Sequence, residues 1–168
     1  MKKILSSLVI VILLLSGCGF YNISKFVAPD DLAFTILIME LDTPKKISDY
    51  MIENFKYVKG NYITKNPYKL YLEKEGDCKD FLCFGSYMAH ANGYEVYKII
   101  IQWRSLFNLH VICIYKEDIY SFTDNQYYYY GFNNFREMVE KSKYINRLEW
   151  ESYKVYDYNG NLIEKGEK

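Results

Sequence analysis

A cysteine directly follows an aspartate in "KEGDCKDFLCFGSYMAHANGY", the amphipathic stretch from Lys74 to Tyr94. Asp77 is a good helix N-cap, Asp80 provides a weaker form of a capping box, and Gly93 is a common helix stop. The predicted helix therefore begins at Cys78. The unpaired N–H groups and the dipole at a helix N-terminus favour a thiolate, which is the nucleophilic form of a cysteine. Cys78 is the candidate nucleophile, and a buried helix-end cysteine is the alternative.

The other cysteines after residue 18 are better placed for packing than for attack. Cys83 lies about 140° around the predicted helix and roughly 7.5 Å along it from Cys78. Cys113 falls in the middle of a predicted strand. A Cys83–Cys113 disulfide remains possible if the chain is exported. The sequence has no CxxC pair and two histidines, so we expect neither a metal centre nor a cofactor.

A thiolate nucleophile needs a base, and the two histidines are the candidates. His90 would lie on the same helix as Cys78, roughly 18 Å along the axis, and cannot reach the sulfur. His110 lies in "LHVICIY" (Leu109–Tyr115), a β-branched stretch typical of a strand that could pack across the helix start. His110 is therefore the candidate base, with a buried core histidine as the alternative.

An imidazole base needs an acceptor on its second nitrogen, because that acceptor fixes the tautomer. Asp124 ends the next predicted strand, "DIYSFTD". In an antiparallel hairpin centred on Glu117, His110 and Asp124 would lie directly opposite each other. Asn125 could orient the ring instead, and Thr-Asp-Asn is also ordinary turn material.

This order of residues resembles the transglutaminase-like superfamily, which is related to papain. The likeness depends on "GDCKDF", "LHVICIY" and "IYSFTD" and covers roughly residues 57–131. It implies that Cys78 is the nucleophile, His110 the acid and base, and Asp124 the group that orients the imidazole.

In this family an upstream side chain commonly completes the oxyanion hole with the backbone N–H of the cysteine. The resemblance suggests Tyr62 for this role, and Tyr57 and Tyr68 are equally defensible.

The elements that must position these residues change character along the chain. Helices are expected over residues 29–41 and 42–58, the second with Thr43 as its N-cap, and residues 59–74 are mostly loop. After the cysteine helix, strands are expected over residues 95–104, 109–115 and 118–124, then a helix from Asn134 to about Tyr144. Asn159-Gly160 predicts a final hairpin. Helices followed by an antiparallel sheet predict an α+β fold, with N-terminal helices packed on the sheet as in the transglutaminase-like core.

The N-terminus has the features of an export signal. Lys2 and Lys3 precede the apolar run "LVIVILLL", which is shorter than the roughly 20 residues that cross a bilayer. The following "LSGC" resembles the lipobox of bacterial lipoproteins, which implies lipidation of Cys18. We expect a signal peptide over residues 1–17, a lipidated tether over 18–28 and a transglutaminase-like domain over 29–168. An uncleaved membrane anchor is the alternative.

Composition limits the range of functions. The 168 residues carry 21 basic and 21 acidic side chains and are 50% hydrophobic, which suits one compact domain and gives no field that selects nucleic acid. We expect a monomer, anchored by lipid to a membrane outside the cytoplasm, that acts on an amide of a protein or peptide through a thioester. The alternatives are an inactive binding module of the same fold and a structural lipoprotein with a Cys83–Cys113 disulfide.

Overall fold

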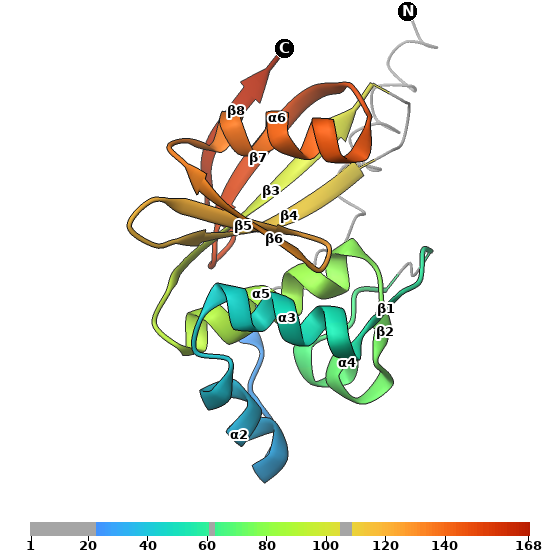
Figure 1. Ribbon diagram of the computed structural model, residues 1–168, viewed down its shortest axis with the longest axis vertical. Coiled ribbons are helices and arrows are strands. Elements are labelled where there is room, and N and C mark those ends of the chain that lie inside the picture. The colour runs from blue at the N-terminus through green and yellow to red at the C-terminus, as the bar shows by residue number, and fades with distance from the viewer. Residues whose placement is uncertain (1–22, 61–62, 105–108) are drawn as a thin grey trace, which may run out of the picture.

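The computed structural model describes residues 23–60, 63–104 and 109–168, and its fold is α+β as predicted. A six-stranded antiparallel sheet has the strand order β6-β5-β4-β3-β7-β8. Helix α6 covers one face of this sheet, α5 and α3 pack against the other face, and α2 lies farther from the sheet (Figure 1).

The helices are η1 (Ile23–Lys25), α2 (Leu32–Glu40), α3 (Pro44–Asn54), α4 (Pro67–Glu73), α5 (Cys78–Ala91) and α6 (Phe135–Asn146). The sheet is formed by β3 (Glu95–Trp103), β4 (Leu109–Lys116), β5 (Tyr120–Asp124), β6 (Tyr127–Phe132), β7 (Trp150–Asp157) and β8 (Leu162–Glu167). A separate parallel pair consists of β1 (Lys56–Tyr57) and β2 (Glu75–Gly76).

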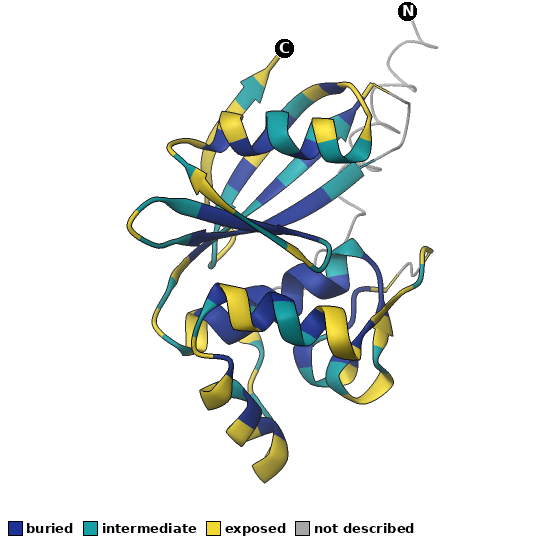
Figure 2. Ribbon diagram, viewed as in Figure 1, coloured by how far each residue is buried: buried dark blue, intermediate teal, exposed yellow. Residues whose placement is uncertain are grey.

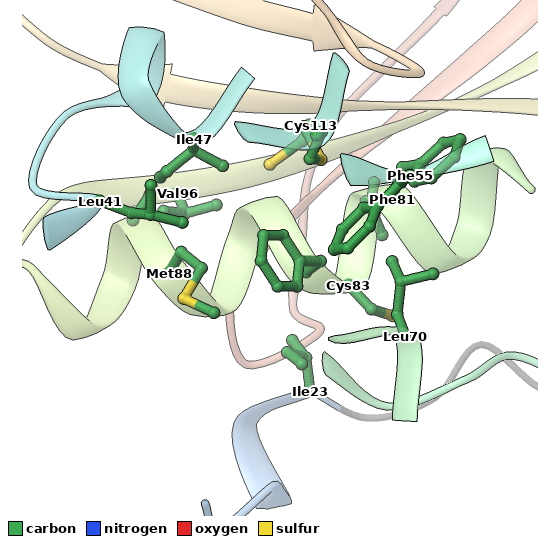
Figure 3. Close-up of a cluster of buried hydrophobic side chains, with 14 of the residues drawn as sticks. Ile23, Leu41, Ile47, Phe55, Leu70, Phe81, Cys83, Met88, Val96 and Cys113 are labelled. Atoms are coloured by element: carbon green, nitrogen blue, oxygen red, sulfur yellow. The ribbon is translucent and has the colours of Figure 1, made fainter. Parts of the chain in front are cut away.

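Strand β4 lies between two hydrophobic cores. Val111, Cys113 and Tyr115 belong to the core around α5, whereas Ile112 and Ile114 belong to the core under α6. This alternation follows from the period of two in a strand, because successive side chains point to opposite faces. Both faces of the central strands are therefore buried (Figure 2), and α5 lies at the centre of the larger cluster (Figure 3).

Most of the predicted elements are present. Thr43 caps α3 by accepting from the backbone N–H of Lys46 at 3.3 Å, and Asn134 caps α6. Gly160, with a φ of 92°, forms the turn between β7 and β8. The run Tyr127–Tyr130 lies in β6, a strand that the sequence analysis did not predict.

The packed part of the chain extends further towards the N-terminus than residue 29. Ile23 is 4% exposed and lies in the core around α5, so the predicted tether ends in a segment that is held by the domain. The predicted signal peptide and Cys18 lie outside the described residues. Within the described ranges, no helix has the length and apolar character needed to cross a bilayer.

Candidate active site

Cys78 is the first residue of α5, and two aspartates hold that helix end in place. The Asp77 carboxylate accepts from the backbone N–H of Lys79 at 2.9 Å, and the buried Asp80 carboxylate accepts from the backbone N–H of Asp77 at 2.9 Å. The capping box is therefore complete, which fixes the helix start as the sequence predicted. Cys78 is partly exposed, whereas Cys83 and Cys113 are buried.

Gly76 is required by the close packing of this turn. A Cβ at that position would lie 2.7 Å from the Asp80 Cβ and 2.9 Å from Leu70 Cδ1. The backbone before Cys78 therefore packs directly on the carboxylate that caps the helix, and a side chain there would displace it.

His110 lies at the start of β4, where its side chain is 11% exposed. Its Nε2 is 2.7 Å from Asp124 Oδ1, and the Trp103 ring stacks beside the imidazole with the centroids 6.2 Å apart. Because Nε2 is occupied by Asp124, Nδ1 is the ring nitrogen that remains for Cys78.

The predicted register of the β4–β5 hairpin is wrong by two residues. Asp124 pairs with Ile112 rather than with His110, because the hairpin is centred on Asp118 and its last pair is Lys116 with Tyr120. A shift of two keeps side chains on the same face of a sheet. His110 therefore reaches Asp124 as a diagonal neighbour, a separation that a long side chain can span.

Asp124 is buried and accepts several hydrogen bonds. Its Oδ2 accepts from the hydroxyl of Ser142 at 2.7 Å and from Nδ2 of Asn146 at 2.9 Å, both on α6. Nδ2 of Asn125 lies 3.3 Å from Oδ1. Asp124, and not Asn125, is thus the group bonded to the imidazole.

The sequence analysis missed Ser142 and Asn146. Ser142 is fully buried on the apolar side of α6 beside Met138 and Val139. The sequence did contain a signal for Ser142, which is a serine in the buried stripe of an amphipathic helix. A buried hydroxyl needs a hydrogen-bond partner, and that partner is Asp124.

The neighbours of His110 favour its protonated form. Burial by itself lowers the pKa of the imidazole, but hydrogen bonds with Asp124 and Cys78, and the negative charge on both, raise the pKa to about 10. A positive charge beside a sulfur stabilises its thiolate. The site spans both layers, because Cys78 comes from the helical layer while His110 and Asp124 come from the end of the sheet.

Tyr57 lies beside the same group of residues. It pairs with Gly76 in the parallel β1–β2 ladder, two residues before Cys78. Burial raises the pKa of the Tyr57 phenol, and the charges of Cys78, Asp77 and Asp124 raise it further.

The structure gives no support for the other two tyrosines that were considered as donors to the oxyanion hole. The Tyr68 hydroxyl donates to Asp31 Oδ2 at 2.8 Å, next to the start of α2. Tyr62 lies outside the described residues. Tyr57 is therefore the tyrosine of the three that the structure places near Cys78.

Cys83 and Cys113 are buried, Cys78 is partly exposed, and all three are free, so the Cys83–Cys113 disulfide considered above is wrong. Burial raises the pKa of Cys83 to about 12 and that of Cys113 to about 11, so both stay protonated at neutral pH.

His90 stacks on Tyr158 with the ring centroids 3.8 Å apart, near the C-terminal end of α5. Among the residues that the structure describes, no group of three or more His, Cys, Asp or Glu could hold a metal ion.

Comparison with known proteins finds similarity in structure alone. No family model matches the chain, and no curated protein matches it. Legionella pneumophila LapG superposes with a TM-score of 0.51 at 15% identity, covering 72% of this chain and 71% of that one. A candidate protease from Parabacteroides distasonis ATCC 8503 superposes with a TM-score of 0.51 at 12% identity, covering 85% of this chain and 28% of that longer one.

The chain has a transglutaminase-like fold. At these identities the comparisons establish the fold, and activity must be argued from the site itself. In this transglutaminase-like fold, Cys78, His110 and Asp124 meet where α5 begins, β4 begins and β5 ends.

Proposed function

We propose that this protein is a thiol-dependent enzyme that cleaves or transfers amide bonds of proteins or peptides. The observation that supports this most strongly is the position of the His110 imidazole, which is bonded to Asp124 through Nε2 and interacts with Cys78. A nucleophile, a base and a group that orients the base make up the arrangement that activates a nucleophile for acyl transfer.

The reaction would proceed through a thioester. The Cys78 thiolate attacks the amide carbon and forms a C–S bond, and the carbonyl oxygen takes the negative charge. The tetrahedral adduct collapses as the C–N bond breaks, and the His110 imidazolium donates its proton to the leaving amine. Water then attacks the thioester while neutral His110 accepts a proton, which releases the acid and restores the thiolate–imidazolium pair. An amine in place of water would give transamidation.

Two groups near the sulfur could stabilise the oxyanion. The backbone N–H of Cys78 belongs to the first turn of α5, whose amides lack intrahelical acceptors. For the second position we propose the hydroxyl of Tyr57, since Tyr57 pairs with Gly76 just before the helix start and the charge of Cys78 acts on its phenol. Donors placed where negative charge develops are commonly the largest contribution to such catalysis.

The test is the alkylation rate of each thiol by iodoacetamide, measured by peptide mass spectrometry on the folded protein. We expect Cys78 to react much faster than Cys83 and Cys113, and His110→Ala to remove that difference. His90→Ala is the matched control, because it replaces the other histidine and leaves the Asp124 pair intact. Equal slow reactivity of all three thiols would contradict the proposal.

An inactive binding module of the same fold is distinguished by Cys78→Ser. A binding function would survive this substitution, whereas acylation by a chromogenic ester such as p-nitrophenyl acetate would be lost from an enzyme.

We also propose that the protein is exported and held at the membrane by a lipid on Cys18, as the "LSGC" sequence suggests. In this proposal residues 1–17 are removed as a signal peptide, and the domain faces substrates outside the cytoplasm. Metabolic labelling with a fatty-acid analogue, lost in Cys18→Ala, tests this point independently of catalysis.

A further inference from the structure

Helix α2 is apolar on its exposed face as well as on its buried face. Leu32, Ile36 and Met39 are 74%, 40% and 62% exposed. Their spacing of four and then three residues places them on one side of the helix. Val27, just before the helix, is 84% exposed. Exposed apolar side chains gathered in one stripe mark a surface that contacts something other than water.

This stripe is fixed to the domain by both ends of α2. At the N-terminal end, Asp31 accepts from the hydroxyl of Tyr68 at 2.8 Å. At the C-terminal end, Nδ2 of Asn92 donates to the carbonyl of Ile38 at 2.7 Å. The Phe34 ring anchors the middle of the helix between the rings of Tyr68 and Tyr71. The exposed stripe is therefore carried by a helix that is bonded to the domain, at the end of the molecule farthest from α6 (Figure 1).

The proposed lipid attachment point is a short stretch of sequence away from the first described residue of the domain. Ile23 is fixed in the core, and Cys18 precedes it by five positions, a length of chain that can span at most about 18 Å. The Phe26 ring packs against Tyr87 of α5 at 4.9 Å, and Phe34 of α2 contacts the same Tyr87 ring. Phe26, which lies between Ile23 and α2, and Phe34 of α2 thus pack against the same residue of α5.

We propose that the stripe of Leu32, Ile36 and Met39 inserts into the surface of the bilayer that holds the lipid anchor. This inference rests on the proposed lipidation and orients the domain on the membrane. A nine-residue helix is roughly 14 Å long, too short to cross a bilayer but suited to lie in its interface.

A second copy of the chain fits this surface less well. A stable dimer buries roughly 800 Å² on each partner, which is more than three side chains and Val27 can provide.

The charges around the stripe also limit the lipids involved. Asp30 and Glu40 are exposed at the two ends of α2, so apolar insertion rather than attraction to anionic lipid would hold the helix.

Quenching of one introduced tryptophan by brominated lipid tests the proposal. The mature lipidated protein, expressed from the full chain, is incorporated into phosphatidylcholine vesicles with bromine on the acyl chains. Ile36→Trp places a reporter in the stripe, and Tyr144→Trp places one at a 79% exposed position on α6. Trp103 and Trp150 are 2% and 0% exposed and give a constant background.

We expect bromolipid to reduce the Ile36→Trp emission by about half, independently of salt, and to leave Tyr144→Trp unchanged. Serine at positions 32 and 39 in the Ile36→Trp protein should restore its emission. Co-flotation with the vesicles reports the anchor separately. Flotation without quenching at residue 36, or with equal quenching at residues 36 and 144, would overturn docking and leave lipidation intact. A protein that does not float would overturn both.

Discussion

The hydroxyl of Ser142 donates a 2.7 Å hydrogen bond to Oδ2 of Asp124, and Oδ1 of the same carboxylate lies 2.7 Å from Nε2 of His110. A helix late in the chain thus positions the carboxylate that orients the candidate base. This relationship makes α6 part of the site although none of its residues is proposed to touch the substrate.

Ser142→Ala should weaken this arrangement. Loss of one donor to a buried carboxylate costs about 1–3 kcal/mol, and a less constrained Asp124 should slow the alkylation of Cys78. Urea unfolding and the pH profile of alkylation measure the two effects. Ser142→Thr, which keeps the hydroxyl, should recover the profile. Ser86→Ala is the matched control, because Ser86 is a buried serine that contacts Cys113 instead. Equal effects of Ser142→Ala and Ser86→Ala on the profile would contradict a positioning role.

Stability should depend on pH through His110. Its pKa rises from an ordinary value of 6.5 to about 10 in the folded protein, through hydrogen bonds and charge that outweigh burial. The folded state therefore binds this proton more tightly than the unfolded state. The resulting stabilisation is fully present below pH 6.5 and is lost as the pH rises through about 10.

The comparison that isolates this effect is wild type against His110→Gln. We expect the difference in unfolding free energy to shrink by a few kcal/mol, as an order of magnitude, between pH 6 and pH 10. His90→Gln should follow the wild-type curve, since it leaves the Asp124 pair in place. A difference that stays constant across this range would show that Asp124 and Cys78 do not hold the proton.

Gly76→Ala should disturb the start of α5. The added methyl would lie 2.8 Å from Oδ2 of Asp80, the oxygen that caps Asp77. Overpacking of this kind typically costs about 1–3 kcal/mol, and displacement of the cap should also slow alkylation of Cys78. Glu75→Ala, at an exposed neighbouring position in β2, is the control. Thermal unfolding and the alkylation rate check both effects, and an unchanged melting temperature would rule out the predicted clash.

Tyr57→Phe tests the proposed oxyanion donor. Loss of one such donor can slow acyl transfer by about 100-fold or more, while the ring still packs against Phe81. Acylation by p-nitrophenyl acetate should slow, and alkylation by iodoacetamide, which forms no oxyanion, should not. Tyr68→Phe removes a hydroxyl that bonds to Asp31 and should leave both rates unchanged. If Tyr57→Phe slowed both reactions equally, Tyr57 would act on the sulfur and not on the oxyanion.

Local signals in the sequence were sufficient to predict the helix and the strands that carry Cys78, His110 and Asp124. Asp77, Asp80 and Gly93 bracket α5 because capping depends on neighbouring residues, and the face of the sheet shared by His110 and Asp124 follows from strand periodicity. The hairpin register was predicted incorrectly because it depends on the geometry of a loop, which here is centred on Asp118 instead of Glu117.

Contacts between distant segments could not be predicted in the same way. Ser142 and Asn146 reach Asp124 only because α6 packs across the sheet, and Tyr57 is brought beside Gly76, two residues before Cys78, by a parallel pair of two-residue strands. Strand β6 was missed because a run of four tyrosines has no alternation of polar and apolar residues.

The division of the site between the two layers affects when the sulfur can react. Before the helical layer and the sheet have come together, Cys78 has no imidazolium beside it and behaves as an ordinary thiol. A chain that is still unfolded would therefore carry an unactivated thiol at this position. Its reactivity would begin only when α5 packs on the sheet and brings Cys78 beside His110.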